Sequence, residues 1–125
     1  MAYLGPVRRW DVFWADLEPT VGREQAGDHR PVLVVSSDRF SNSPLRLVMG
    51  VPLSAREGKR RFFDEFEIPL PTGLIEPDVT PVAMTHQLRS LSTLRLLDYA
   101  GRLDDPDLYG EIEDALVAHL GIELE

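Results

Sequence analysis

Two polar side chains stand at the ends of apolar segments, where a folded chain can present them to a ligand. Arg30 directly precedes the apolar run PVLVV of residues 31–35, and Ser54 closes a second apolar segment, LRLVMGVPLS, at residues 45–54. A guanidinium at the mouth of a rigid strand is a good clamp for a phosphate or carboxylate group. Arg30 is therefore a candidate anion-binding residue, and we expect Ser54 to emerge from the core beside a cleft.

The segment before this arginine is a polar loop with a defined shape. Pro19, Gly22 and Gly27 punctuate residues 16–29. Glycine is the usual residue where the backbone takes a positive φ or approaches a ligand closely. We therefore expect a shaped loop that faces Arg30.

The charge of the chain is unevenly distributed. The formal net charge is −8, which by itself argues against a nucleic-acid partner. Residues 1–63, however, hold ten Lys or Arg against seven Asp or Glu, whereas residues 64–125 hold three against fourteen. The basic half includes a loop directly after Ser54 with four cations, Arg56, Lys59, Arg60 and Arg61. This asymmetry indicates a polyanion-binding face, although ordinary solvated surface explains the charges equally well.

The composition limits the classes of protein and of chemistry. A chain of 125 residues suits one domain with a modest core, so we expect a single domain over residues 1–125. The chain has no cysteine, which excludes disulfides and thiol catalysis, and its three histidines show no zinc-binding spacing. Because we find neither a run of about 18 apolar residues nor a secretory leader, we expect a cytoplasmic protein without membrane contact.

Alternating and continuous apolar patterns predict several short strands. Residues 8–17 alternate with aromatic side chains on both faces. Trp10 and Trp14 fit a core, while Phe13 or Trp14 could instead offer a stacking surface to an unpaired base. Further strands are expected at residues 31–36, 45–54, 62–70, 79–84 and 99–103. The 62–70 strand should be half buried, with its acidic side chains mostly outward.

Local signals define a helix at the C-terminal end. Asp105 is a suitable N-cap, Pro106 a suitable first residue, and Gly121 a suitable stop. The expected buried stripe is Leu108, Ile112, Ala115, Leu116 and Leu120. Residues 37–44 are predicted to form a turn or short loop, and residues 91–97 give no clear signal. Short strands followed by one helix predict an α+β, mainly β domain, a small and partly open barrel.

The loop and its following strand resemble the MazF/PemK family, the toxins of bacterial toxin-antitoxin pairs. The matching residues are Asp16, Leu17, Pro19, Gly22, Glu24, Gln25, Gly27, Arg30, Pro31, Val32 and Val34. Weaker similarity continues through residues 51–54 and 87–89 to the C-terminal helix, so it covers nearly the whole chain. The resemblance implies an SH3-like (CcdB/PemK-like), partly open β-barrel that works as a homodimer.

The resemblance also implies a reaction and its residues. The family cleaves single-stranded RNA without a metal or cofactor, by attack of a ribose 2′-hydroxyl on the adjacent phosphorus. Such a reaction needs a base, an acid and hydrogen-bond donors for the phosphoryl oxygens. Arg30 matches the catalytic arginine, and Ser54 stands where threonine is more common. Glu24 and His29 are candidate bases, although Glu24 also suits a turn cap or a pair with Arg23, and His29 a surface position.

Further residues are expected to contact RNA. They are Arg23, Gln25, Arg56, Lys59, Arg60, Gln87 and Arg89. Gln87 is expected to brace the site or to read a base edge, and Arg89 to contact phosphate or the second copy. A purely structural role is an equal alternative for both residues.

The chain departs from the family pattern at two places. Asp28 and His29 stand between Gly27 and Arg30, where many members have one residue, and His86 stands where aspartate is common. The implied protein partner is a cognate antitoxin whose acidic tail competes for the RNA groove. The alternative function is a non-catalytic, protein-binding toxin, because a related toxin on this fold acts on DNA gyrase by contact.

Overall fold

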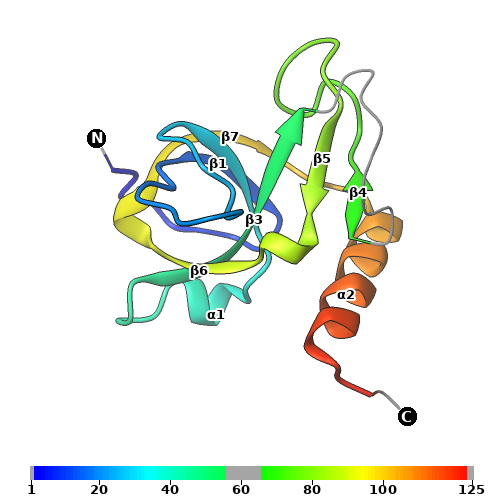
Figure 1. Ribbon diagram of the computed structural model, residues 1–125. Helices are drawn as coiled ribbons and strands as arrows, with labels where there is room; N and C mark the ends of the chain where they lie inside the picture. The colour runs from blue at the N-terminus through cyan, green and yellow to red at the C-terminus, as the bar shows by residue number, and fades with distance from the viewer. Residues whose placement is uncertain (1, 56–65, 124–125) are drawn as a thin grey trace.

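The chain forms a curved antiparallel sheet with one long helix at its C-terminal end (Figure 1). The computed structural model describes residues 2–55 and 66–123. The elements, in order, are β1 (Asp11–Ala15), β2 (Arg30–Val34), α1 (Asp38–Ser41), β3 (Leu47–Ala55), β4 (Glu67–Pro69), β5 (Pro81–Met84), the 3₁₀ turn η1 (Thr85–Gln87), β6 (Arg89–Ser92), the 3₁₀ turn η2 (Thr93–Arg95), β7 (Leu96–Arg102) and α2 (Pro106–Leu120).

The sheet curls like a barrel but does not close. Its strand order is β4-β5-β3-β2-β1-β7, and β6 pairs with β3 beside this path. All these pairs are antiparallel. The prediction of a mainly β, partly open barrel with a C-terminal helix is therefore confirmed.

The long strand β3 joins the two parts of the sheet and carries Ser54 near its end. One edge of β3 pairs with β6 from Leu47 to Gly50 and then with β5 from Leu53 to Ala55. Pro52 lies between these two partners, where the lack of a backbone N–H interrupts no ladder on that edge. The proline therefore marks a change of partner inside the strand rather than the end of the strand.

The two faces of the central strands enter two different cores. Val12 and Leu33 belong to a cluster that includes Ile112 of α2, whereas Phe13 and Val32 belong to a second cluster. Neighbouring residues of one strand point to opposite faces, so a strand covered on both sides must be apolar throughout. This is why residues 31–35 read as a continuous apolar run.

The C-terminal helix has the predicted ends. One carboxylate oxygen of Asp105 accepts hydrogen bonds from the backbone N–H groups of Asp107 at 3.1 Å and Leu108 at 3.3 Å. The helix ends at Gly121, which has a φ of 68°. Leu120 was expected in the buried stripe, but its side chain is 63% exposed, so the stripe ends one turn earlier.

Several strand boundaries and one turn differ from the prediction. The first strand starts only at Asp11, because Trp10 takes a positive φ of 76°. The predicted turn at residues 37–44 contains α1, which Ser37 caps by accepting a hydrogen bond from the Phe40 N–H at 3.2 Å. Residues 91–97 were unassigned and contain the end of β6, η2 and the start of β7. Elements this short contain too few residues to show a periodic pattern of apolar side chains.

The outward placement of acid in the 62–70 segment is wrong for Glu67. This residue is 1% exposed and pairs in register with Met84, which is also buried. Directly paired residues of antiparallel strands share a face, so the register places Glu67 on the covered side. Residues 62–65 of this prediction lie outside the described residues.

Within the described part of the chain, the longest helix is too short and too polar to cross a membrane.

Candidate active site

Four strand ends meet at one edge of the sheet and surround a pocket of about 180 Å³. Because neighbouring strands run antiparallel, the end of β1, the start of β2, the end of β3 and the start of β5 lie together. The lining residues are Trp14, His29, Arg30, Pro31, Leu53, Ser54, Ala55, Ile75, Glu76, Val79 and Pro81. Arg30 and Ser54, which the sequence placed on separate strands, thus line one pocket.

Arg30 is the first residue of β2 and is exposed. Its Nε donates a hydrogen bond of 2.9 Å to the backbone oxygen of Ala26. Gly27, which has a φ of 131°, lies against the side chain so closely that an added Cβ would be 2.5 Å from both Cγ and Nε of Arg30. The glycine therefore makes the space in which the arginine side chain lies, and the Nε bond uses only one of the five guanidinium donors.

Residues 16–29, which we call the tongue, are tied at their base. The Leu17 N–H donates to the Gly27 oxygen at 2.9 Å, and the Gly27 N–H donates to a carboxylate oxygen of Glu18 at 2.8 Å. Arg95 donates to the backbone oxygen of Asp16 at 3.0 Å. These bonds give the loop the defined shape that its glycines predicted.

Ser54 lies next to the end of β3, opposite Val82 of β5. It is half-buried, and its preceding neighbour Leu53 is fully buried. The hydroxyl therefore stands on a strand that is anchored by the core, with the pocket beside it. This confirms the expected emergence of Ser54 beside a cleft.

An aromatic pair forms one wall of the pocket. The rings of Trp14 and His29 are stacked at 4.5 Å between centroids, with 5° between their planes. The stack covers a face of the imidazole, whose nitrogens lie in the ring plane. Phe13, the other proposed stacking residue, is fully buried, so that alternative is wrong, whereas Trp10 is a core residue as predicted.

The other predicted tongue residues lie away from this pocket. A carboxylate oxygen of Glu24 accepts a hydrogen bond of 2.6 Å from the Val21 N–H, which is the turn-capping alternative. Arg23 and Gln25 are instead connected to Gln87, whose side-chain oxygen accepts from the Gln25 N–H at 3.0 Å. The Gln87 side-chain nitrogen donates to the Arg23 oxygen at 2.9 Å. Both ends of the Gln87 amide therefore brace the tongue.

Arg89 contacts the base of the tongue, where it donates to the Leu17 oxygen at 3.3 Å. The three basic residues predicted after Ser54, namely Arg56, Lys59 and Arg60, lie outside the described residues.

Glu76 and the apolar wall of the pocket were missed at the sequence level. Residues 76–78 belong to a turn, in which the Val79 N–H donates to the Glu76 oxygen at 3.3 Å. Ile75, Glu76 and Val79 reach the pocket because this turn lies across from β2 and β3. No local pattern reveals that proximity, because it depends on the pairing of β3 with β5.

The pocket combines groups of three chemical kinds. Arg30 and Ser54 supply hydrogen-bond donors for an anion, and His29 and Glu76 supply groups that accept protons. Trp14 and the apolar residues supply a surface on which a planar group can lie. Among residues 2–55 and 66–123, no three His, Cys, Asp or Glu side chains gather as a metal site would require.

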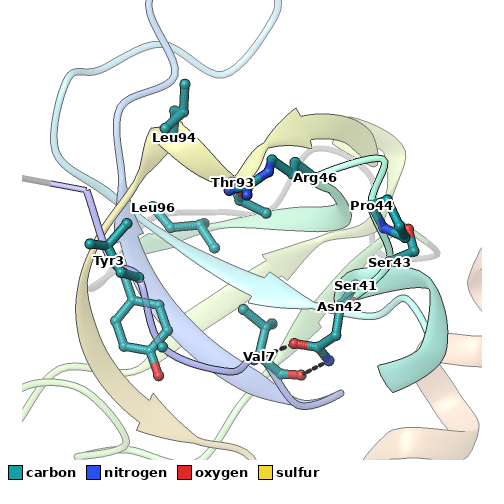
Figure 2. Close-up of a pocket in the computed structure, with 12 residues that line it drawn as sticks. Tyr3, Val7, Ser41, Asn42, Ser43, Pro44, Arg46, Thr93, Leu94 and Leu96 are labelled. Carbon is teal, nitrogen blue, oxygen red and sulfur yellow. Dashed lines mark hydrogen bonds between the residues drawn. The ribbon is translucent and has the colours of Figure 1, made fainter.

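A second, larger hollow of about 480 Å³ lies near α1 and η2 and shares no lining residue with the first (Figure 2). Asn42 in its wall is occupied with Val7, from whose N–H it accepts at 3.0 Å and to whose oxygen it donates at 2.7 Å. Leu4 and Leu94 line it and are 84% and 69% exposed. It lacks the acid-base groups of the first pocket, which makes it a candidate contact surface.

The fold and the motifs agree with one family of toxins. Residues 8–120 match the family of PemK-like, MazF-like toxins of type II toxin-antitoxin systems, and the chain belongs to this family. It is 34% identical over 120 residues to endoribonuclease MazF9 of Mycobacterium tuberculosis, and the aligned region covers 93% of this chain and 98% of that protein. It is 35% identical over 119 residues to endoribonuclease EndoA of Bacillus subtilis, covering 93% and 96% of the two chains.

Solved structures of similar proteins have the same fold. The crystal structure of MazF from Deinococcus radiodurans matches with a TM-score of 0.75 at 24% identity, over 94% of this chain and 98% of that one. A mycobacterial endoribonuclease solved with its cognate antitoxin matches with a TM-score of 0.68 at 19% identity, over 98% and 100%. At these identities the likeness supports the fold alone.

Proposed function

We propose that this toxin is an endoribonuclease that cleaves single-stranded RNA, messenger RNA included, at selected sequences and thereby arrests growth. The observation that carries the proposal is the shared pocket of Arg30 and Ser54, two hydrogen-bond donors suited to one phosphate group. The endoribonuclease names of the two relatives, each about a third identical over 93% of this chain, support it. We further propose that residues 1–125 are a single toxin domain that acts in the cytoplasm.

The proposed reaction is an internal transesterification that uses no metal ion. The ribose 2′-oxygen forms a bond to the adjacent phosphorus and the bond to the 5′-oxygen breaks, which yields a 2′,3′-cyclic phosphate and a 5′-hydroxyl end. The 2′-hydroxyl proton passes to a base, and the leaving 5′-oxygen receives a proton from an acid. Arg30 and Ser54 donate to the phosphoryl oxygens, where negative charge grows in the transition state.

His29 and Glu24 are the two proposed bases. An arginine is a poor base because it stays protonated at physiological pH, so another group must accept the 2′-hydroxyl proton. His29 lines the pocket, which favours it, while the Glu24 carboxylate is engaged by the Val21 N–H. A rotation of the Glu24 side chain would be needed before it could act.

The test of the proposal is cleavage of an unstructured RNA by the parent and by two Arg30 variants in the presence of EDTA. The parent should cut and leave cyclic phosphate and 5′-hydroxyl ends. Arg30→Ala should lose about 100- to 1,000-fold in rate, because one preorganised donor is worth that much. Arg30→Lys, which keeps the charge but loses the planar fork, should fall between the two.

Arg39→Ala is the matched control, since Arg39 is an exposed arginine on α1 and does not line the pocket. It should cleave as the parent does. No cutting of any unstructured RNA at micromolar parent protein, or full activity in Arg30→Ala, would refute the proposal.

We assign RNA binding outside the catalytic pocket to the tongue and to the basic loop after Ser54. The residues are Arg23, Gln25, Arg56, Lys59, Arg60, Gln87 and Arg89. For Gln87 and Arg89 the contribution is indirect, since both hold the tongue backbone in place. The excess of basic residues in the first half of the chain supports this face as the one that receives a polyanion.

The proposed protein partners are a cognate antitoxin and a second copy of the chain. A complex of a structurally similar mycobacterial endoribonuclease with its antitoxin supports the first. For the second, we place the contact at the hollow of Figure 2, where Leu4 and Leu94 are strongly exposed. Exposed apolar side chains grouped in this way are typical of a protein interface.

A further inference from the structure

The pocket beside Arg30 contains groups besides the donors that hold a phosphate group. Ile75 and Val79 give it an apolar wall, and Glu76 is an exposed residue of the same lining. A phosphate group gains nothing from an apolar wall and is repelled by a carboxylate. These residues therefore suit a different part of the substrate than the scissile phosphate.

The aromatic and acidic groups together suit a nucleobase. Trp14 and His29, stacked at 4.5 Å, give the pocket an aromatic wall, and unpaired bases commonly stack on such side chains. A carboxylate accepts hydrogen bonds from an exocyclic amino group, as glutamate does from N4 of cytosine. Uracil has the carbonyl oxygen O4 in place of this amino group, and a carbonyl oxygen cannot donate a hydrogen bond to the carboxylate.

The loop that carries Glu76 is built to hold its position. The Gly73 N–H donates to the Val79 oxygen at 3.0 Å, and the hydroxyls of Thr72 and Thr80 are 2.6 Å apart. The Val79 N–H closes the turn onto the Glu76 oxygen at 3.3 Å. These bonds close the loop at both its base and its tip, so that Glu76 is presented on a preorganised backbone.

We propose that this pocket binds one unpaired base next to the scissile phosphate, and that Glu76 selects bases with an exocyclic amino group over uracil. The inference rests on the proposed function for the placement of the phosphate at Arg30. It makes Glu76 a specificity residue, which touches the base, and gives it no role in the proton transfers of the cleavage step.

The direct test is a binding experiment that needs no cleavage. Short single-stranded oligonucleotides of deoxycytidine and of deoxyuridine lack the attacking 2′-hydroxyl and differ at the group that Glu76 would contact. The parent should bind the deoxycytidine strand about tenfold more tightly, the effect of one good base contact. Glu76→Gln, whose amide can both donate and accept, should bind the two strands about equally.

Glu111→Gln is the control for charge, because Glu111 is exposed on α2 and does not line the pocket. It should keep the parent's ratio of the two affinities even if both affinities rise. Equal binding of the two strands by the parent, or an unchanged ratio in Glu76→Gln, would overturn the proposal.

A second experiment separates this inference from the proposed function. A randomised RNA pool is cut by the parent and by Glu76→Gln, and the new ends are mapped. Uracil should be disfavoured at one fixed position beside the cut in the parent and accepted there in the variant. A uniform loss of cutting at all sequences in the variant would make Glu76 a catalytic group and overturn the proposal. The parent could cut no RNA and still bind the deoxycytidine strand more tightly, with Glu76→Gln losing that preference. In that case the proposed function fails and the base pocket stands.

Discussion

At the scale of single residues, the site depends on the contact between a glycine and an arginine. Gly27 takes a φ of 131°, and a Cβ added to it would lie 2.5 Å from the Arg30 side chain. The position therefore requires glycine twice, once for the backbone and once for the space. The Nε bond to the Ala26 oxygen then fixes the direction of the arginine.

Gly27→Ala should weaken both stability and cleavage. The backbone conformation costs an L-residue about 1–3 kcal/mol, and the new methyl group displaces the arginine side chain. We expect a lower melting temperature in circular dichroism and a fall in cleavage rate of at least about tenfold at a temperature where the variant is folded, because a displaced donor loses most of its effect.

Gly110→Ala is the matched control for this change. Gly110 is inside α2, and an added Cβ there would have nothing within 4 Å. Alanine should stabilise the helix by about 0.5–1 kcal/mol and leave cleavage unchanged. Full activity in Gly27→Ala would show that the arginine tolerates displacement and would contradict its proposed role.

Variants of single residues can identify the group that accepts the 2′-hydroxyl proton. If His29 takes the 2′-hydroxyl proton, its protonation at low pH must remove activity. His29→Ala should then lose the acidic limb of the pH–rate profile together with most of the rate. Glu24→Gln, a variant of the tongue, should keep that limb. An acidic limb that is unchanged in His29→Ala would exclude the histidine as the base.

At the scale of elements, the tongue is positioned by residues that follow β5. Gln87 of η1 binds the tongue backbone at Arg23 and Gln25, and Arg89 of β6 binds it at Leu17. The tongue precedes Arg30 directly, so its anchoring fixes the entry of β2 into the site. A short turn between two strands thus supports a loop that is distant in sequence.

Gln87→Ala should loosen the tongue without unfolding the core. Loss of the bond to the Gln25 N–H, worth about 1 kcal/mol, should raise the hydrogen-exchange rate of that amide about fivefold. Gln87→Glu keeps an acceptor for Gln25 but loses the donor to Arg23, so it should protect the Gln25 amide better than alanine does. Exchange at Leu33, in the core of β2, should stay the same in both variants, and unchanged exchange at Gln25 would refute the brace.

At the scale of the whole molecule, the two proposed functions fall on different groups of surface residues. The pocket with Arg30 lies where β1 and β3 end and β2 and β5 begin, whereas the larger hollow lies beside α1 and η2 (Figure 2). One surface carries polar and aromatic groups for a substrate, and the other exposes leucines. The two hollows share no lining residue, so the proposed contact with a second copy and the proposed catalytic pocket involve different parts of the surface.

Leu94→Glu should convert the proposed homodimer to a monomer, because a buried, unpaired carboxylate is costly at an interface. Leu120→Glu is the control, since Leu120 is also a strongly exposed leucine, at 63%, but lies on α2. Sedimentation velocity should give a dimer for the parent and the control, and a monomer for Leu94→Glu. A monomeric parent would contradict the dimer, and a dimeric Leu94→Glu would contradict the location of its contact.

The sequence by itself determined the features that depend on neighbouring residues. The ends of α2 followed from Asp105, Pro106 and Gly121, because caps act within one turn of the helix. The buried strand after Arg30 followed from a continuous apolar run, and the shaped tongue from its glycines. These local signals, with the family motif, were sufficient for the partly open β fold and for the candidate residues Arg30, Ser54 and His29.

Only the tertiary structure decided which of these residues meet. The pairing of β3 with both β2 and β5 brings Ser54 and the Glu76 turn to Arg30, and the register of β1 on β2 places Trp14 beside His29. The pairing of β4 with β5 buries Glu67, which its own sequence placed outside. Strand register is set by contacts between segments far apart in the chain, so no local pattern contains it.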